Sequence, residues 1–173
     1  LYTVTGFQSA LSIILIIAFT MRKWGGYEKY FGTSVFWSAS KIQIGLTLLW
    51  TYHLFAFFIT LWYGRMELEQ NILRYLMFES YSWIFWLNVI FIFLIPFWIL
   101  VWNPVRKTAW GPALAGIFIL VGNLLFQIRI FVGAFNAGDI YHLGLFKVPP
   151  PVFPDVWDIF MVLGGIGLVA FIY

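Results

Sequence analysis

The sequence contains no cysteine, so it forms no disulfide and offers no thiolate ligand for zinc or for an iron–sulfur cluster. Charged residues are also scarce: they make up 10% of the 173 residues, whereas 62% are hydrophobic, and the mean hydropathy is +0.91. The net charge of +3 is spread along the chain, which argues against a nucleic-acid partner. This composition is typical of a membrane protein.

Long apolar runs fill most of the chain. Five of them are each about 18 to 22 residues long, and at about 1.5 Å per residue a helix of that length crosses a hydrocarbon layer of roughly 30 Å. They cover residues 1–21, 42–63, 81–102, 112–131 and 156–173. Because the runs lack the alternating pattern of barrel strands, they predict helices. The expected fold class is therefore all-α: a polytopic transmembrane helical bundle with five membrane-spanning helices.

The basic residues favour one side of this expected bundle. Six follow the first run or the third, on the same side of the membrane: Arg22, Lys23, Lys29, Lys41, Arg106 and Lys107. Three lie on the opposite side: Arg65, Arg74 and Lys147. By the positive-inside rule, the side with six basic residues is cytoplasmic. Since the chain begins and ends within apolar runs, we expect it to be part of a longer subunit.

Four local features predict further detail. Residues 66–78 have acidic residues early and Arg74 late, as a helix dipole prefers, so we expect a short helix at the membrane surface. Pro96 lies inside the third run and predicts a kink. Gly6 and Ala10 are four residues apart and predict close packing of the first helix against a neighbour. The segment between Arg22 and Ser40 contains several glycines and is expected to be a loop.

Polar residues inside the apolar runs are the first candidates for function, because burying them without a partner is costly. We expect them to form a buried polar seam: Gln43, Thr47, Thr60, Asn88, Asn123, Gln127 and Arg129. Such a seam supplies either interhelical hydrogen bonds, each worth about 0.6 kcal/mol on average, or a path for protons or quinone. For Arg129 the alternatives are a guanidinium that extends to the lipid headgroups and one that pairs with an acid of the outer loops, such as Glu69 or Glu79.

His53 lies in the second run, and three further candidates for chemistry lie near the outer surface. A haem between helices usually needs opposed histidines, and the only other histidine, His142, falls in an expected loop. The sequence therefore predicts no haem, and His53 is either a proton-transferring or a hydrogen-bonding residue. Tyr63, Glu69 and Arg74 bring phenol, acid and base to the outer interface, where an aromatic belt and a solvated surface are the simpler interpretation.

The order of several short motifs is more specific than any one of them. Lys41 precedes Leu49-Trp50-Thr51-Tyr52 and Trp62-Tyr63-Gly64, and the later motifs are Phe93-Leu94-Ile95-Pro96-Phe97, Arg106-Lys107 and Phe153-Pro154-Asp155. In this order they resemble the NrfD/polysulfide reductase membrane-subunit family, and within it the quinol-oxidising membrane subunits of bacterial alternative complex III. The chain departs from the family where Trp37-Ser38-Ala39 and Glu67-Leu68-Glu69 replace more polar or proline-containing sequences.

The resemblance implies the C-terminal half of a subunit built from two four-helix bundles, in the inner (cytoplasmic) membrane of a bacterium. It implies binding of menaquinone or ubiquinone without a redox centre in this chain, and docking on iron–sulfur and cytochrome c subunits and on a paralogous membrane subunit. It leaves open which bundle holds the quinone. The candidates for quinone binding or proton transfer are His53, Tyr63, Glu69 and Arg74. The alternatives are a non-catalytic scaffold or anchor and, less favoured without an inverted repeat, a secondary transporter.

Overall fold

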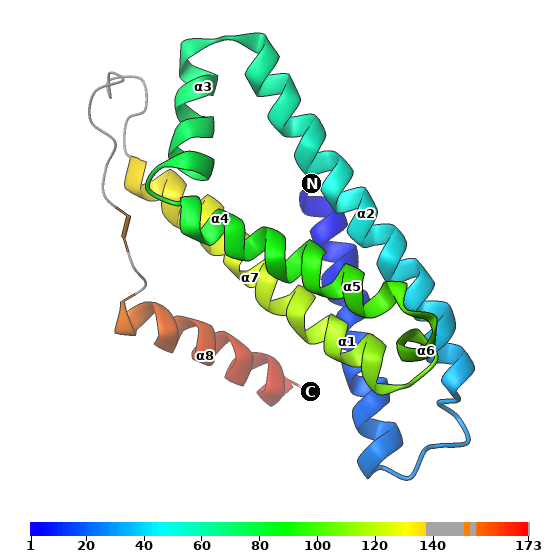
Figure 1. Cartoon of the computed structure of the whole chain (residues 1–173). Helices are drawn as coiled ribbons and strands as arrows, with labels where there is room; N and C mark the ends of the chain where they lie inside the picture. Colours follow the sequence, from blue (N-terminus) through cyan, green and yellow to red (C-terminus); the bar gives the residue numbers. More distant parts are fainter. Residues whose placement is uncertain (138–150, 153–154, 173) are drawn as a thin grey trace.

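The structure, a computed structural model, describes residues 1–137, 151–152 and 155–172, and every secondary-structure element in that part of the chain is helical (Figure 1). Four helices are long and apolar enough to cross a membrane. They are α1 (Tyr2–Trp24), α2 (Thr33–Gly64), the continuous helix Ser82–Val101 and α7 (Trp110–Ala137). The structure therefore confirms the prediction of an all-α protein with helices long and apolar enough to span a membrane.

The fifth predicted span coincides with α8 (Val156–Ile172), a helix of 17 residues. Figure 1 shows α8 apart from the other helices, and no contact joins it to another helix among the described residues. At about 1.5 Å per residue it is about 26 Å long, slightly short of a typical hydrocarbon layer. A fifth span and a second bundle stay predictions.

Helix α2 is longer than the apolar run that predicts it. It begins at Thr33, so the expected loop is shorter than predicted, and its 32 residues extend for about 48 Å. The added residues 33–41, about two and a half turns, are helical because Phe36 is fully buried against Leu15 and Ala18 of α1. Lys41 therefore lies within α2, where its Nζ is 3.5 Å from the centroid of the Trp37 ring.

The third span contains a π-helical turn. It consists of α4 (Ser82–Val89), the π-helical segment η2 (Ile90–Leu94) and α5 (Ile95–Val101), and the short α6 (Asn103–Arg106) follows. Pro96 is the second residue after the π-helical turn. A proline ring clashes with the carbonyl four residues earlier, which is that of Ile92, and a wider turn relieves that clash. The predicted irregularity at Pro96 thus takes the form of a widened turn before the proline.

Helix α7 packs between α1 and the α4–α5 helix, and small residues allow its close approach. A Cβ at Gly116 would lie 3.3 Å from the carbonyl oxygen of Ser12 on α1. The expected packing role of Gly6 and Ala10 is wrong, because a Cβ at Gly6 would meet nothing within 4 Å and Ala10 is exposed. The small residues that bring helices together are therefore on α7.

The predicted short helix near residues 66–78 is present as α3 (Glu67–Leu73) and the π-helical segment η1 (Arg74–Phe78). Arg65, in the left-handed conformation at φ 49°, ends α2, and α3 then turns back beside α2 (Figure 1). Leu73, Tyr75 and Met77 are buried. We call residues 67–78 the outer segment. One face of the outer segment packs on the bundle, whereas the prediction was a helix that lies at the membrane surface.

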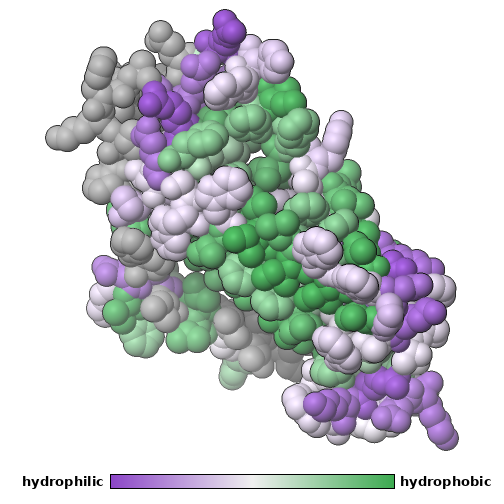
Figure 2. All heavy atoms as spheres, in the orientation of Figure 1, coloured by the Kyte–Doolittle hydropathy of each residue, from purple (hydrophilic) through white to green (hydrophobic). Residues whose placement is uncertain are grey.

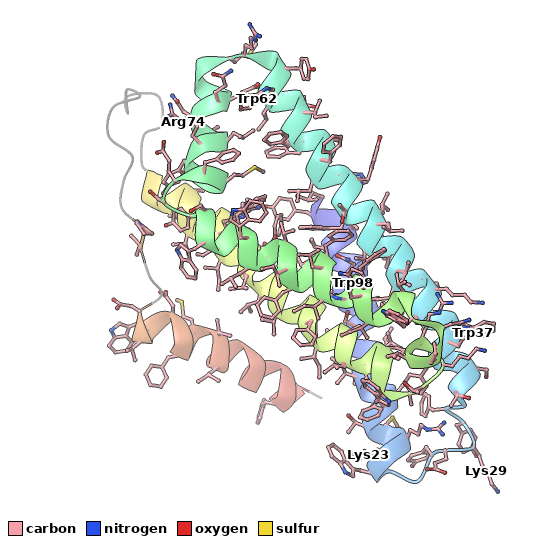
Figure 3. All side chains as sticks on the ribbon, viewed as in Figure 1. Lys23, Lys29, Trp37, Trp62, Arg74 and Trp98 are labelled. Atoms are coloured by element: carbon pink, nitrogen blue, oxygen red, sulfur yellow. The ribbon has the colours of Figure 1, made fainter. Side chains whose placement is uncertain are left out.

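Hydrophilic residues gather at two ends of the molecule with a hydrophobic region between them (Figure 2). Figure 3 places Lys23 and Lys29 at one end and Trp62 and Arg74 at the other. This separation is the arrangement that the distribution of basic residues predicts for helices that cross a membrane.

We expect single cysteines to label according to this arrangement, and the chain has no cysteine of its own to interfere. In Lys29→Cys and Lys107→Cys variants, a membrane-impermeant maleimide should react from the cytoplasmic face, and in Met66→Cys it should react from the opposite face. Labelling of Lys29→Cys and Met66→Cys from the same face would contradict α2 as a membrane span.

Candidate functional site

The structure separates His53 from the other three residues predicted for quinone binding or proton transfer. His53 is half-buried in the middle of α2, and its Nδ1 lies 2.8 Å from the carbonyl oxygen of Leu49, one turn earlier. Its ring meets the Tyr52 ring edge-on at 5.6 Å. Tyr63, ten residues further on, is about 15 Å away along the helix axis. His53 and Tyr63 therefore do not share one site.

Tyr63, Glu69 and Arg74 lie at the outer end of the bundle. Tyr63 is 78% exposed, and a Cβ at Gly64 would lie 3.2 Å from Glu69 Oε2, so the Glu69 carboxylate is packed against the end of α2. Arg74 pairs with Glu79 at 3.3 Å, and both side chains are partly exposed, so this ion pair adds at most about 1 kcal/mol to stability. Tyr63, Glu69 and Arg74 therefore share one end of the bundle, and we call these three residues the polar group.

The buried polar residues of α1 and α2 form a reciprocal set of hydrogen bonds, which we call the amide clamp. Gln8 Nε2 of α1 donates to Thr47 Oγ1 of α2 at 3.4 Å, and Gln43 Nε2 of α2 donates to Ser12 Oγ of α1 at 2.8 Å. Each hydroxyl in turn donates to the carbonyl four residues earlier on its own helix, Ser12 to Gln8 and Thr47 to Gln43. All four side chains are fully buried. The clamp thus fixes the register of α1 against α2.

Gln8 and Ser12, half of this clamp, are not among the residues predicted for the seam, whereas the prediction for Thr60 is wrong. Gln8 and Ser12 are four apart on α1, as Gln43 and Thr47 are on α2, and this repeated glutamine-to-hydroxyl spacing is the signal that identifies them. Thr60 is exposed and donates to the carbonyl of Ala56 on its own helix. Thr60 lies outside the buried seam because the buried residues of α2 all lie between Phe36 and Trp50.

Asn123 extends the buried polar contacts to α7. Its Nδ2 donates to the carbonyl of Thr5 at 3.2 Å and to Ser9 Oγ at 2.8 Å, both on α1. Gln127, one turn later, is half-buried. Asn88 on α4 is fully buried, and its Nδ2 donates to the carbonyl of Gly122 on α7 at 2.6 Å. Asn88 and Asn123 of the predicted seam therefore form interhelical contacts on two sides of α7.

Arg129 is buried on α7, which rules out the first predicted alternative, a guanidinium at the lipid headgroups. It is 2% exposed, so the guanidinium does not extend to the headgroups, and it forms no ion pair with an acidic residue among those described. Instead its Nη1 lies 3.4 Å from the carbonyl oxygen of Leu76, in η1. Its Cζ is 5.0 Å and 5.6 Å from the ring centroids of Phe85 and Phe126. Arg129 thus connects α7 to the outer segment.

A second contact supports this connection. Tyr75 Oη donates to the carbonyl of Gly133 on α7 at 3.3 Å, and a Cβ at Gly133 would lie 3.0 Å from Leu76 Cδ2. The position of the outer segment, and with it that of Glu69 and Arg74, therefore depends on the end of α7.

We expect Arg129→Ala to loosen the outer segment, because it removes the hydrogen bond to the Leu76 carbonyl and the contacts with both rings. Amide hydrogen exchange at residues 74–78 should accelerate about tenfold, which corresponds to about 1.4 kcal/mol for a charged hydrogen bond. Arg65→Ala, which changes an exposed arginine, is the matched control. Unchanged exchange in Arg129→Ala would contradict a positioning role for this residue.

In the part of the chain that the structure describes, no three residues among His, Cys, Asp and Glu gather into a group that could hold a metal ion. His142 lies outside the described residues. No protein-family model matches the chain, and neither does any curated protein.

Proposed function

We infer that this chain is an integral membrane subunit of a quinol-oxidising electron-transfer complex of the alternative complex III kind, in the bacterial inner membrane. The proposal includes menaquinol or ubiquinol as the substrate, and iron–sulfur and cytochrome c subunits and a paralogous membrane subunit as partners. Its support is the order of motifs from Lys41 to Asp155, together with a bundle of helices long and apolar enough to span a membrane.

The observation that carries the proposal is the polar group at the outer end of the bundle. Quinol oxidation releases two protons and passes two electrons to an acceptor, so a site needs a proton acceptor and a hydrogen-bond donor for the quinone oxygen. Glu69 is the proton acceptor in this proposal, and Tyr63 and Arg74 are the donors. Their place at the interface lets protons leave to the outer aqueous phase, and the contacts of Arg129 with η1 hold this group in position.

A second candidate, a non-catalytic scaffold or anchor of such a complex, is favoured by a different observation. Buried amides on α1, α2, α4 and α7 donate interhelical hydrogen bonds, and His53 Nδ1 is bonded within its own helix. These are structural contacts, worth about 0.6 kcal/mol each on average in membrane proteins. A subunit with only such contacts would position its partners without touching the quinol.

Purification of the tagged protein from its native membrane separates these possibilities from an unrelated function. We expect it to copurify with haem-containing and iron–sulfur subunits and the preparation to oxidise quinol. Copurification without a redox subunit would contradict the proposal. A photoreactive quinone analogue then distinguishes the two candidates: crosslinks to residues 63–74 support a quinol site in this bundle, and crosslinks confined to another part of the complex support the scaffold.

A further inference from the structure

Four buried polar atoms in the core between α1, α2 and α7 have no hydrogen-bond partner in the described part of the chain. Three are acceptors, Gln8 Oε1, Gln43 Oε1 and Asn123 Oδ1, and one is a donor, Trp50 Nε1. Each of these side chains is at most 5% exposed. In the hydrocarbon region, each unsatisfied polar group costs several kcal/mol, so four of them in one core require a ligand that satisfies them.

The amide clamp brings two of these atoms to the same interface. Each Nε2 is held by a hydroxyl on the facing helix, so both amide groups lie between α1 and α2. The two contacts are one helical turn apart, because Gln8 and Ser12 are four residues apart on α1, and side chains at that spacing are about 5–6 Å apart. Because its two O–H bonds are about 105° apart, a water that donates two hydrogen bonds of about 2.8 Å joins oxygens about 4.5 Å apart, which is close to this spacing.

The chemistry of the four atoms selects water over a metal cation. A cation would satisfy the three carbonyl oxygens, but it would repel the N–H of Trp50, which lies three residues after Thr47 on the same face of α2. The residues that form these contacts carry no charge, and an uncompensated charge at this depth is expensive. Water is the smallest ligand that both donates to carbonyl oxygens and accepts from an indole N–H.

We propose that the core between α1, α2 and α7 is a binding site for internal water, in which one molecule donates to both Gln8 Oε1 and Gln43 Oε1. The bound water completes the amide clamp and makes it a closed connection between the two helices. Trp50 and Asn123 extend the site toward α7. None of these side chains titrates near neutral pH, so the site holds water without itself releasing protons. It is independent of the proposed quinol chemistry.

Water-edited solid-state NMR on the protein in lipid bilayers, with labelled glutamine, tests this site. We expect transfer of magnetisation from water protons to the side-chain amides of both Gln8 and Gln43. Because one water is shared, Gln43→Leu should lower the transfer to Gln8 by about fivefold or more. Thr20→Val, which removes a hydroxyl of α1 that bonds only within its own helix, is the matched control and should leave the transfer unchanged.

Three results would overturn the proposal: no water transfer to either amide in the wild-type protein, unchanged transfer to Gln8 in Gln43→Leu, or transfer that depends on sodium or potassium. If Gln43→Leu does not fold, a cryo-electron microscopy map of the wild-type protein decides the question. The expected map has a density peak within about 3.2 Å of both Oε1 atoms. A direct bond between the two amides would exclude the water.

Discussion

Gly122→Ala should be among the most destabilising single-methyl additions to this bundle. A Cβ at position 122 would lie 2.5 Å from Ile92 Cγ1, 3.0 Å from the backbone nitrogen of Ile92 and 3.1 Å from the carbonyl carbon of Phe91. Backbone atoms cannot rotate away as the end of a flexible side chain can, so α7 and η2 must separate. Overpacking of this kind costs up to about 3 kcal/mol, which is more than a hundredfold in the folding equilibrium.

The measurement is equilibrium unfolding of the purified protein in mixed micelles with increasing denaturing detergent. Gly45→Ala is the matched control, because Gly45 is also inside a long helix but a Cβ there would meet nothing within 4 Å. The control should keep or slightly raise the stability, since alanine favours helix more than glycine does. Equal stability of the two variants would show that α7 does not contact the π-helical turn closely.

Much of this architecture follows from the apolar runs alone, because in hydrocarbon each backbone group must bond within its own helix. That requirement places α1, the α4–α5 helix and α7 within a few residues of their predicted positions. It does not determine where α2 begins, since Phe36 extends the helix only because Leu15 and Ala18 provide a surface to bury it. The π-helical turn before Pro96 has a local cause in the proline ring, but the close packing of Gly122 against that turn depends on the tertiary fold.

The sequence predicts the positions of the helices better than it predicts which polar side chains are buried. An apolar run shows no face, so Thr60 and Gln43 look alike in sequence, yet Thr60 is exposed and Gln43 is fully buried in the amide clamp. The burial of Arg129 depends on an outer segment that packs back on the bundle, which neither hydropathy nor charge distribution indicates. Helix positions are encoded locally, whereas the direction in which a polar side chain points depends on which helices surround it.

Glu69→Gln should slow quinol oxidation by about 10²-fold, the effect typical of losing one proton-transferring group. Glutamine keeps the size of the side chain and its packing against Gly64, but it cannot accept the proton. The measurement is turnover divided by the amount of assembled complex, so that a variant that only impairs assembly lowers the yield and leaves turnover unchanged. Glu28→Gln, which changes an exposed acid near Lys29 at the opposite end of the bundle, is the matched control.

His53→Ala completes this test, because the structure places His53 about 15 Å from Tyr63 along α2. With its Nδ1 bonded to the Leu49 carbonyl, His53 is expected to leave turnover within about twofold of the wild type if the outer group alone accepts protons. A loss of about 10²-fold in His53→Ala together with normal turnover in Glu69→Gln would move the proton route from the interface into the bundle. Normal turnover in both variants would leave this bundle with the role of a scaffold, because the amide clamp and the contacts of Arg129 would then account for its polar residues.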